Sequence, residues 1–264
     1  MLALTGNPQQ NSVRLLSAGA TTLGLSVLFD SAMEHYRGSF RNPAMALPLI
    51  ASSVSIGFDG SGKGGGVPRG LSHGASIAIG MLGFGFHAYN VLKQPGGLTA
   101  QNMFYKAPLG APGALVLAGA LGGASDRLAA DAEAFGSGRV LAALAAFGIM
   151  GSVGEAGLLH LKGSYQNPAM FLPVTIPVAA AASLAIDAAT GNPKPWTLAL
   201  LGATALVGTV GVGFHAYGVS RNMGGWRNWR QNLLARPPLP APPAFSGLAI
   251  AAFGALLLMR RANG

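Results

Sequence analysis

Apolar runs and short polar segments alternate along the whole chain. Each run approaches the roughly 17 to 25 residues that an α-helix needs to cross a bilayer. The runs predict membrane helices at residues 15–35, 43–58, 71–92, 107–124, 139–161, 168–187, 196–219 and 243–260. We therefore expect an all-α integral membrane protein with eight transmembrane helices.

Three motifs return later in the chain, in the same order. Residues 34–45 match 159–170, residues 85–89 match 213–217, and residues 101–112 match 231–242, at offsets of 125, 128 and 130. The offset grows in small steps, as loops gain residues, which indicates an internal repeat. We predict that residues 1–124 and 139–264 are two copies of one four-helix unit, joined by a polar linker at 125–138. An even number of helices returns the chain to the same side of the membrane, so the two copies are expected to be parallel.

Composition supports a membrane location and excludes several kinds of site. Only 9% of the residues are charged, against about 25% in an ordinary soluble domain. The formal charge is +9, and the basic residues lie between the apolar runs, which suits lipid headgroups, heme propionates or an acidic partner better than nucleic acid. The absence of cysteine excludes disulfides, iron–sulfur clusters ligated by this chain and c-type heme attachment.

Ionisable residues inside the predicted helices are the strongest candidates for function, because polar groups in a bilayer are costly. Six of them form matched pairs between the two copies: Asp30 with Glu155, His35 with His160, and His87 with His215. Each copy thus has two histidines near the same end of its first and third helices. Such a pair suits a b-type heme with two histidine ligands to the iron.

Other features near the histidines are compatible with heme. The third-helix histidines follow glycines that would clear a flat surface for a macrocycle: Gly83, Gly85, Gly211 and Gly213. Arg37 and Lys162 are expected near the membrane surface, where they could pair with propionates. Counted along the sequence, His35 and His87 lie at different distances from the nearest basic residue. At 1.5 Å per helical residue, this predicts that the two histidines differ in membrane depth by about 6 Å.

The histidines also have other interpretations. They could bond across helices as packing contacts, hold a metal ion together with a carboxylate, or bind a chlorophyll-type pigment. The carboxylates of Asp30 and Glu155 are expected to bond a neighbouring helix or to move protons beside a quinone. His73 has no histidine counterpart in the second copy and is expected at the surface, near a helix start.

Two further repeated features are expected to be structural. The Asn-Pro-Ala triplets that begin at Asn42 and Asn167 are predicted to cap helices, with proline in the first helical position. The loops 93–107 and 220–242 are predicted to lie at the membrane interface, where Trp226 and Trp229 would form part of an aromatic belt. The same loops are candidates for a docking surface.

These observations favour a b-type cytochrome-like subunit with two hemes b. It would anchor a redox or photosynthetic complex in a bacterial inner (cytoplasmic) membrane and exchange electrons with a quinone or another carrier. A larger protein complex would dock on loops 93–107 and 220–242. The alternatives are a transporter or channel with a pathway between the copies, lined by Asp30 and Glu155, and a structural subunit without a cofactor.

Overall fold

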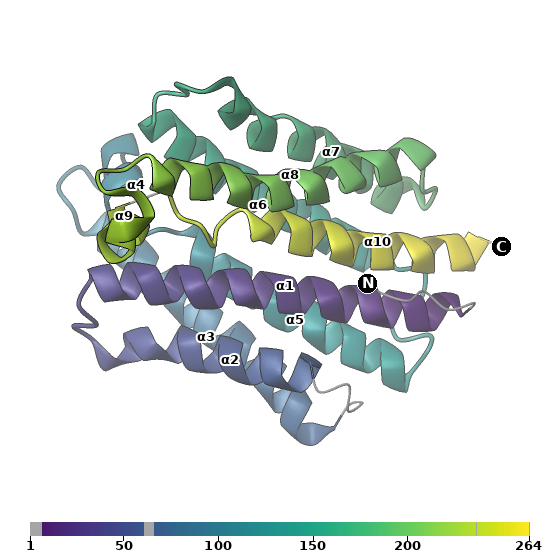
Figure 1. The fold of residues 1–264 in the computed structure, drawn as a ribbon. Helices are drawn as coiled ribbons and strands as arrows, with labels where there is room; N and C mark the ends of the chain where they lie inside the picture. The colour runs from purple at the N-terminus through teal and green to yellow at the C-terminus, as the bar shows by residue number, and fades with distance from the viewer. Residues whose placement is uncertain (1–6, 61–65, 236, 264) are drawn as a thin grey trace.

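The computed structural model describes residues 7–60, 66–235 and 237–263. These residues form helices joined by turns and loops, and they contain no strand (Figure 1). Arg236, in the second of the predicted docking loops, lies outside the described residues.

The helices run antiparallel to their neighbours in one bundle (Figure 1). The α-helices are α1 Pro8–Arg37, α2 Leu47–Gly60, α3 Val67–Leu92, α4 Ala100–Tyr105, α5 Gly110–Ala130, α6 Arg139–Lys162, α7 Ile176–Thr190, α8 Pro195–Ser220, α9 Trp229–Ala235 and α10 Pro243–Asn263. Three 3₁₀ helices accompany them: η1 Pro43–Ala46, η2 Pro168–Val174 and η3 Gly225–Asn228.

Six segments are long and apolar enough to cross a membrane, which agrees with an integral membrane protein. They are Pro8–Arg37, Val67–Leu92, Arg139–Lys162, Pro168–Thr190, Pro195–Ser220 and Pro243–Ala262. The other two predicted runs also contain helices, α2 and α5, but these are not among the six. The α2 segment is shorter, and α5 carries Asp126 and Arg127 near its end.

Helix α5 extends further than predicted, to Ala130 instead of residue 124. Two contacts hold its polar last turns in place: Ser125 donates a hydrogen bond to the carbonyl of Val13 (3.0 Å), and Asp126 forms an ion pair with Arg69. The segment expected to be a polar linker therefore begins inside a helix.

The helices form two groups of four. Around the first group, α1 contacts α2, α2 contacts α3, α3 contacts α5, and α5 contacts α1. Helices α6, α7, α8 and α10 follow the same cycle. The groups meet mainly where α1 packs along α10, with a smaller contact between α5 and α6. Consequently α1 and α3 occupy opposite corners of one group, and α6 and α8 occupy opposite corners of the other.

The contact between α1 and α10 depends on two glycines that face each other. A Cβ atom on Gly19 would lie 2.6 Å from the carbonyl oxygen of Gly247, and one on Gly247 would lie 2.8 Å from the carbonyl oxygen of Gly19. Leu16, Leu23 and Leu248 are completely buried beside this crossing. Small residues let helices approach closely in lipid, where dispersion contacts replace the hydrophobic driving force.

We expect Gly19→Ala and Gly247→Ala each to destabilise the protein by about 1–3 kcal/mol, because the added methyl group forces α1 and α10 apart. The measurement is the melting temperature of the detergent-purified protein. Gly202→Ala on α8 is the matched control, since a Cβ there meets no atom within 4 Å. Equal melting temperatures for Gly19→Ala and Gly202→Ala would contradict this account of the crossing.

Candidate functional site

The histidines of the first group meet across the bundle. His35 lies near the end of α1 and His87 near the end of α3, and their ring centroids are 6.5 Å apart with an angle of 68° between the ring planes. The mismatch in depth expected from the sequence therefore does not separate the two rings. In the second group, His160 and His215 are close enough to interact electrostatically.

Each of these four paired histidines uses Nδ1 for a hydrogen bond to the backbone. The partners of Nδ1 are the carbonyl oxygens of Met45 for His35 (2.6 Å), Pro108 for His87, Met170 for His160 (2.8 Å) and Pro238 for His215 (2.6 Å). A carbonyl oxygen can only accept, so Nδ1 must carry the proton. In the neutral imidazole this leaves the lone pair on Nε2, the arrangement found in most histidines that bind a metal.

A strained turn follows each first-helix histidine. Ser39 and Phe40 have φ angles of 58° and 45°, and Ser164 and Tyr165 have φ angles of 58° and 46°. Residues other than glycine are uncommon in this left-handed region, and such strain tends to occur at functional sites. The turn brings the Phe40 ring edge-on to His35, at 6.1 Å between centroids, and the Tyr165 ring edge-on to His160, at 6.0 Å.

The Asn-Pro-Ala triplets cap helices, as predicted. The Asn42 side chain accepts a hydrogen bond from the backbone N–H of Ala44 (2.9 Å), and Asn167 accepts one from Ala169 (2.9 Å). Proline occupies the first position of η1 and of η2. The caps fix the start of the second helix in each group, which is where the carbonyl groups bonded to His35 and His160 lie.

Two buried asparagines hold the loops that lead to the other two carbonyl acceptors. Asn102 donates to the carbonyl oxygens of Pro95 (3.1 Å) and Gly97 (2.7 Å), and Asn232 donates to those of Met223 (3.2 Å) and Gly225 (2.7 Å). The repeated Gln-Asn pair was visible in the sequence, but nothing in its spacing showed that the asparagine side chain organises the loop.

The four candidate glycines occupy two environments. A Cβ atom on Gly83 would lie 3.5 Å from Pro112, and one on Gly211 would lie 2.8 Å from Pro242, so these glycines accommodate the proline near the start of the fourth helix. Gly85 and Gly213 are exposed, and a Cβ atom there would meet nothing within 4 Å.

Arg37 and Lys162 contact segments of the opposite group. Arg37 pairs with Glu34 and donates to the carbonyl oxygens of two α9 residues, Leu233 and Leu234. The ammonium group of Lys162 lies over the ring of Tyr105 in α4, 4.4 Å from its centroid. Each of these basic residues thus ties a short loop helix of one group to the first helix of the other.

The candidate carboxylates lie where the groups meet. The Glu155 carboxylate on α6 lies directly against Gly110, the first residue of α5, where a Cβ atom would collide with it. Asp30 and Glu34 on α1 are close enough to interact electrostatically with Glu155. Asp30 of α1 and Glu155 of α6, which are matched in the sequence, therefore lie within electrostatic range of each other.

His73 corrects a prediction. It was expected at the surface, yet only 1% of it is exposed. Its ring lies between carboxylates from α2 and α5, the two helices that pack on α3 at that level. The position near a helix start suggested exposure, whereas the neighbouring helices cover that start.

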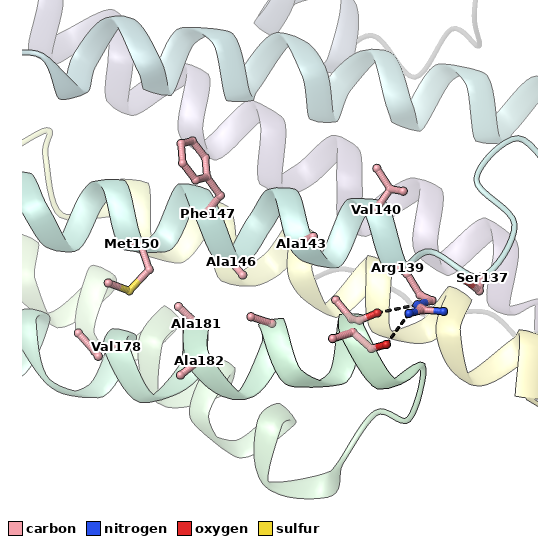
Figure 2. A pocket seen from close by; sticks show the side chains of 13 residues that line it. Ser137, Arg139, Val140, Ala143, Ala146, Phe147, Met150, Val178, Ala181 and Ala182 are labelled. Atoms are coloured by element: carbon pink, nitrogen blue, oxygen red, sulfur yellow. Dashed lines mark hydrogen bonds between the residues drawn. The ribbon is translucent and has the colours of Figure 1, made fainter.

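A groove of about 970 Å³ runs between α6 and α7 (Figure 2). Its walls are mostly alanine, with Phe147, Met150 and Val178 among the larger side chains. At one end Arg139 donates to the carbonyl oxygens of Ala188 (2.6 Å) and Ala189, so its guanidinium group caps α7 (Figure 2). The groove is apolar and offers no titratable cluster for chemistry.

Within the ranges described, no three or more histidine, aspartate or glutamate side chains gather in a way that could hold a metal ion. If a histidine pair held a metal, the described residues would supply two ligands, and a macrocycle could supply the others.

Comparisons of the chain with protein-family models, with curated proteins and with solved structures find no match.

We expect Asn102→Ala to loosen the loop that supplies the acceptor for His87, because two backbone carbonyl groups lose their donor, at a cost of about 1–3 kcal/mol. Tryptic cleavage at Lys106 should become several-fold faster than in the unmodified protein. The control is Gln101→Ala, which changes the exposed neighbouring residue. If both variants are cleaved at the same rate, Asn102 does not hold the loop.

Proposed function

We propose that this chain is a membrane-embedded b-type cytochrome-like subunit with one bis-histidine heme site in each of two parallel four-helix units. His35 with His87, and His160 with His215, would be the axial ligands. The observation that carries the proposal is the hydrogen bond from Nδ1 to a backbone carbonyl in all four histidines, which orients each ring and leaves Nε2 as the ligating atom.

The distance between the first pair of rings supports the same proposal. Two imidazoles on opposite sides of one metal have ring centres roughly 6 Å apart, since each bond from metal to nitrogen is about 2 Å long. The centroids of His35 and His87 are 6.5 Å apart. The ligands also come from opposite corners of a four-helix group, and bundle cores are where such cofactors are usually held.

The proposal includes eight membrane helices in two repeats. The six long apolar segments would be completed by α2 with η1 and by α5. Two observations support this. The helices of both groups contact one another in the same cyclic sequence. The histidine bonds, the strained turns and the asparagine caps also recur in both groups.

In such a subunit the protein would position a one-electron carrier and tune it. A bound heme supplies the electron transfer itself. The chain holds each imidazole by its carbonyl bond, which raises the basicity of Nε2. The rings of Phe40 and Tyr165 pack edge-on against the first-helix histidines.

Helices α4 and α9 lie at the end of the bundle that holds the four histidines (Figure 1). Tyr105, Trp226 and Trp229 of this end are all exposed. We propose that this end, formed by loops 93–107 and 220–242, docks a redox or photosynthetic partner in a bacterial cytoplasmic membrane. Electrons would pass between that partner and a quinone or another carrier.

Heme content per chain tests the assignment of ligands. The protein purified from cells with ample heme is expected to hold two hemes. His35→Ala and His160→Ala should each lose about half of the heme absorbance, and the double variant should lose all of it, because the two sites are separate. The measurement is a pyridine hemochrome assay normalised to protein concentration.

His73→Leu is the matched control, because His73 is a buried histidine outside the proposed sites. It should keep both hemes. Full heme content in the His35→Ala, His160→Ala double variant, or no heme in the unmodified protein, would reject the proposal.

A second candidate function has a specific observation in its favour. Glu155 of α6 lies with Asp30 and Glu34 of α1 where the two groups meet. Such a cluster could line a proton or cation pathway between the units, or serve proton movement beside a quinone.

If this pathway exists, proteoliposomes containing the protein should show proton flux that Glu155→Gln reduces at least tenfold, since the amide cannot release a proton. A pH-sensitive dye inside the liposomes measures the flux. Glu133→Gln is the control, because the Glu133 side chain is 74% exposed and outside the cluster. Equal flux in the two variants would argue against this candidate.

A further inference from the structure

A second group of buried charges lies at the end of the bundle opposite the histidine pairs. It contains Asp59 of α2, Arg69 and His73 of α3, and Asp126 of α5. Arg69 is 2.9 Å from Asp59 and 2.7 Å from Asp126. Nε2 of His73 is 3.5 Å from Asp59 and 3.3 Å from Asp126. We refer to these four residues as the charged layer.

The charged layer is shielded from solvent, and its histidine is not fully bonded. The side chains of His73 and Asp59 are 2% and 3% exposed, and those of Arg69 and Asp126 are 10% and 13% exposed. In the part of the chain that the structure describes, neither Nδ1 nor Nε2 of His73 has a hydrogen-bond partner. The imidazole occupies the space above Gly122 of α5, where any Cβ atom would collide with the ring.

The second half of the chain keeps only one of these charges. The sequence offsets of 128 and 130 place Asp187 at the position of Asp59 and neutral residues at the other positions: Thr197 for Arg69, Leu201 for His73, Ala252 for Gly122 and Leu256 for Asp126. All five of these residues are completely buried.

Neutral side chains therefore replace Arg69, His73 and Asp126 at this level of the second group, and the carboxylate of Asp187 there accepts a hydrogen bond from the backbone N–H of Lys194 (3.1 Å). Gly122 and His73 differ together from Ala252 and Leu201, so the room for the ring exists only where the ring is present. Packing alone gives no reason for Arg69, His73 and Asp126.

The charges of this layer balance when His73 holds a proton. Two carboxylates and one guanidinium give a net charge of −1, and an imidazolium brings it to zero. Among the described residues, the charged groups that face His73 from α2, α3 and α5 are Asp59, Arg69 and Asp126. Arg127, the next residue of α5, is exposed.

We propose that the charged layer is a binding site for a single proton. His73 takes up the proton from water, and its Nε2–H then donates to Asp59 and Asp126. Arg69 is a fixed countercharge that contacts both carboxylates. Release of the proton leaves a neutral ring and one uncompensated carboxylate. The partly exposed carboxylate of Asp126 provides the contact with water.

The test is a pH titration of the full chain in detergent, labelled with ¹⁵N-histidine and observed by NMR between pH 5 and 9. The proposal predicts one titrating histidine that is absent from His73→Leu. Asp126→Asn should lower the proton affinity of this histidine by about tenfold or more, because an opposite charge within a few ångströms favours the protonated form. Glu133→Gln, which removes an exposed carboxylate, should have no effect.

The assignment does not depend on the stability of His73→Leu, since the resonance that shifts in Asp126→Asn but not in Glu133→Gln identifies His73. A second variant gives an independent test: Arg69→Thr, His73→Leu, Gly122→Ala and Asp126→Leu together introduce the residues that the second group has at these positions. This variant should fold and lack the titration. A His73 that stays neutral or stays charged over the whole range, or a midpoint unchanged by Asp126→Asn, would overturn the proposal.

Discussion

A hydrogen bond from each paired histidine to a backbone carbonyl connects the end of one helix to the start of the next. His35 reaches Met45 in η1, and His87 reaches Pro108, just before α5. These bonds satisfy a polar side chain that would be costly in lipid, and they fix its rotation and its tautomer. The strained turn at Ser39 and Phe40 and the loop held by Asn102 place those carbonyl groups correctly. The bonds that fix the orientation of each imidazole thus also connect the helices.

The two halves share this arrangement and differ elsewhere. The matched histidine bonds have nearly the same geometry. At the opposite end, the first half has Arg69, His73 and Asp126 where the second half has neutral residues, and both halves have a buried aspartate. The packing between the halves is also unequal, because α1 lies along α10 far more extensively than α5 lies along α6. The repeated scaffold therefore tolerates a change of side chains in one layer. The end of the bundle that holds the paired histidines is the part that is alike in both halves.

The apolar runs predicted where every long helix would lie, because a run of that length in lipid has to satisfy its backbone internally. The repeat predicted which histidines would have matching positions and that Asn42 and Asn167 would act as caps. Partners distant in sequence were harder to predict: the contact of Arg37 with α9 depends on how the two groups dock. His73 was misplaced because its cover comes from Asp59 and Asp126, which no local pattern connects to it.

The most direct test of the central proposal is an electron paramagnetic resonance spectrum of the ferric, detergent-purified protein, with spins counted per chain. Two hemes ligated by His35 with His87 and by His160 with His215 predict a low-spin bis-imidazole spectrum, at two spins per chain and without a high-spin component. A protein from heme-replete cells that shows no heme resonance, or a high-spin one from an iron with a single histidine, would contradict the assignment of these four residues.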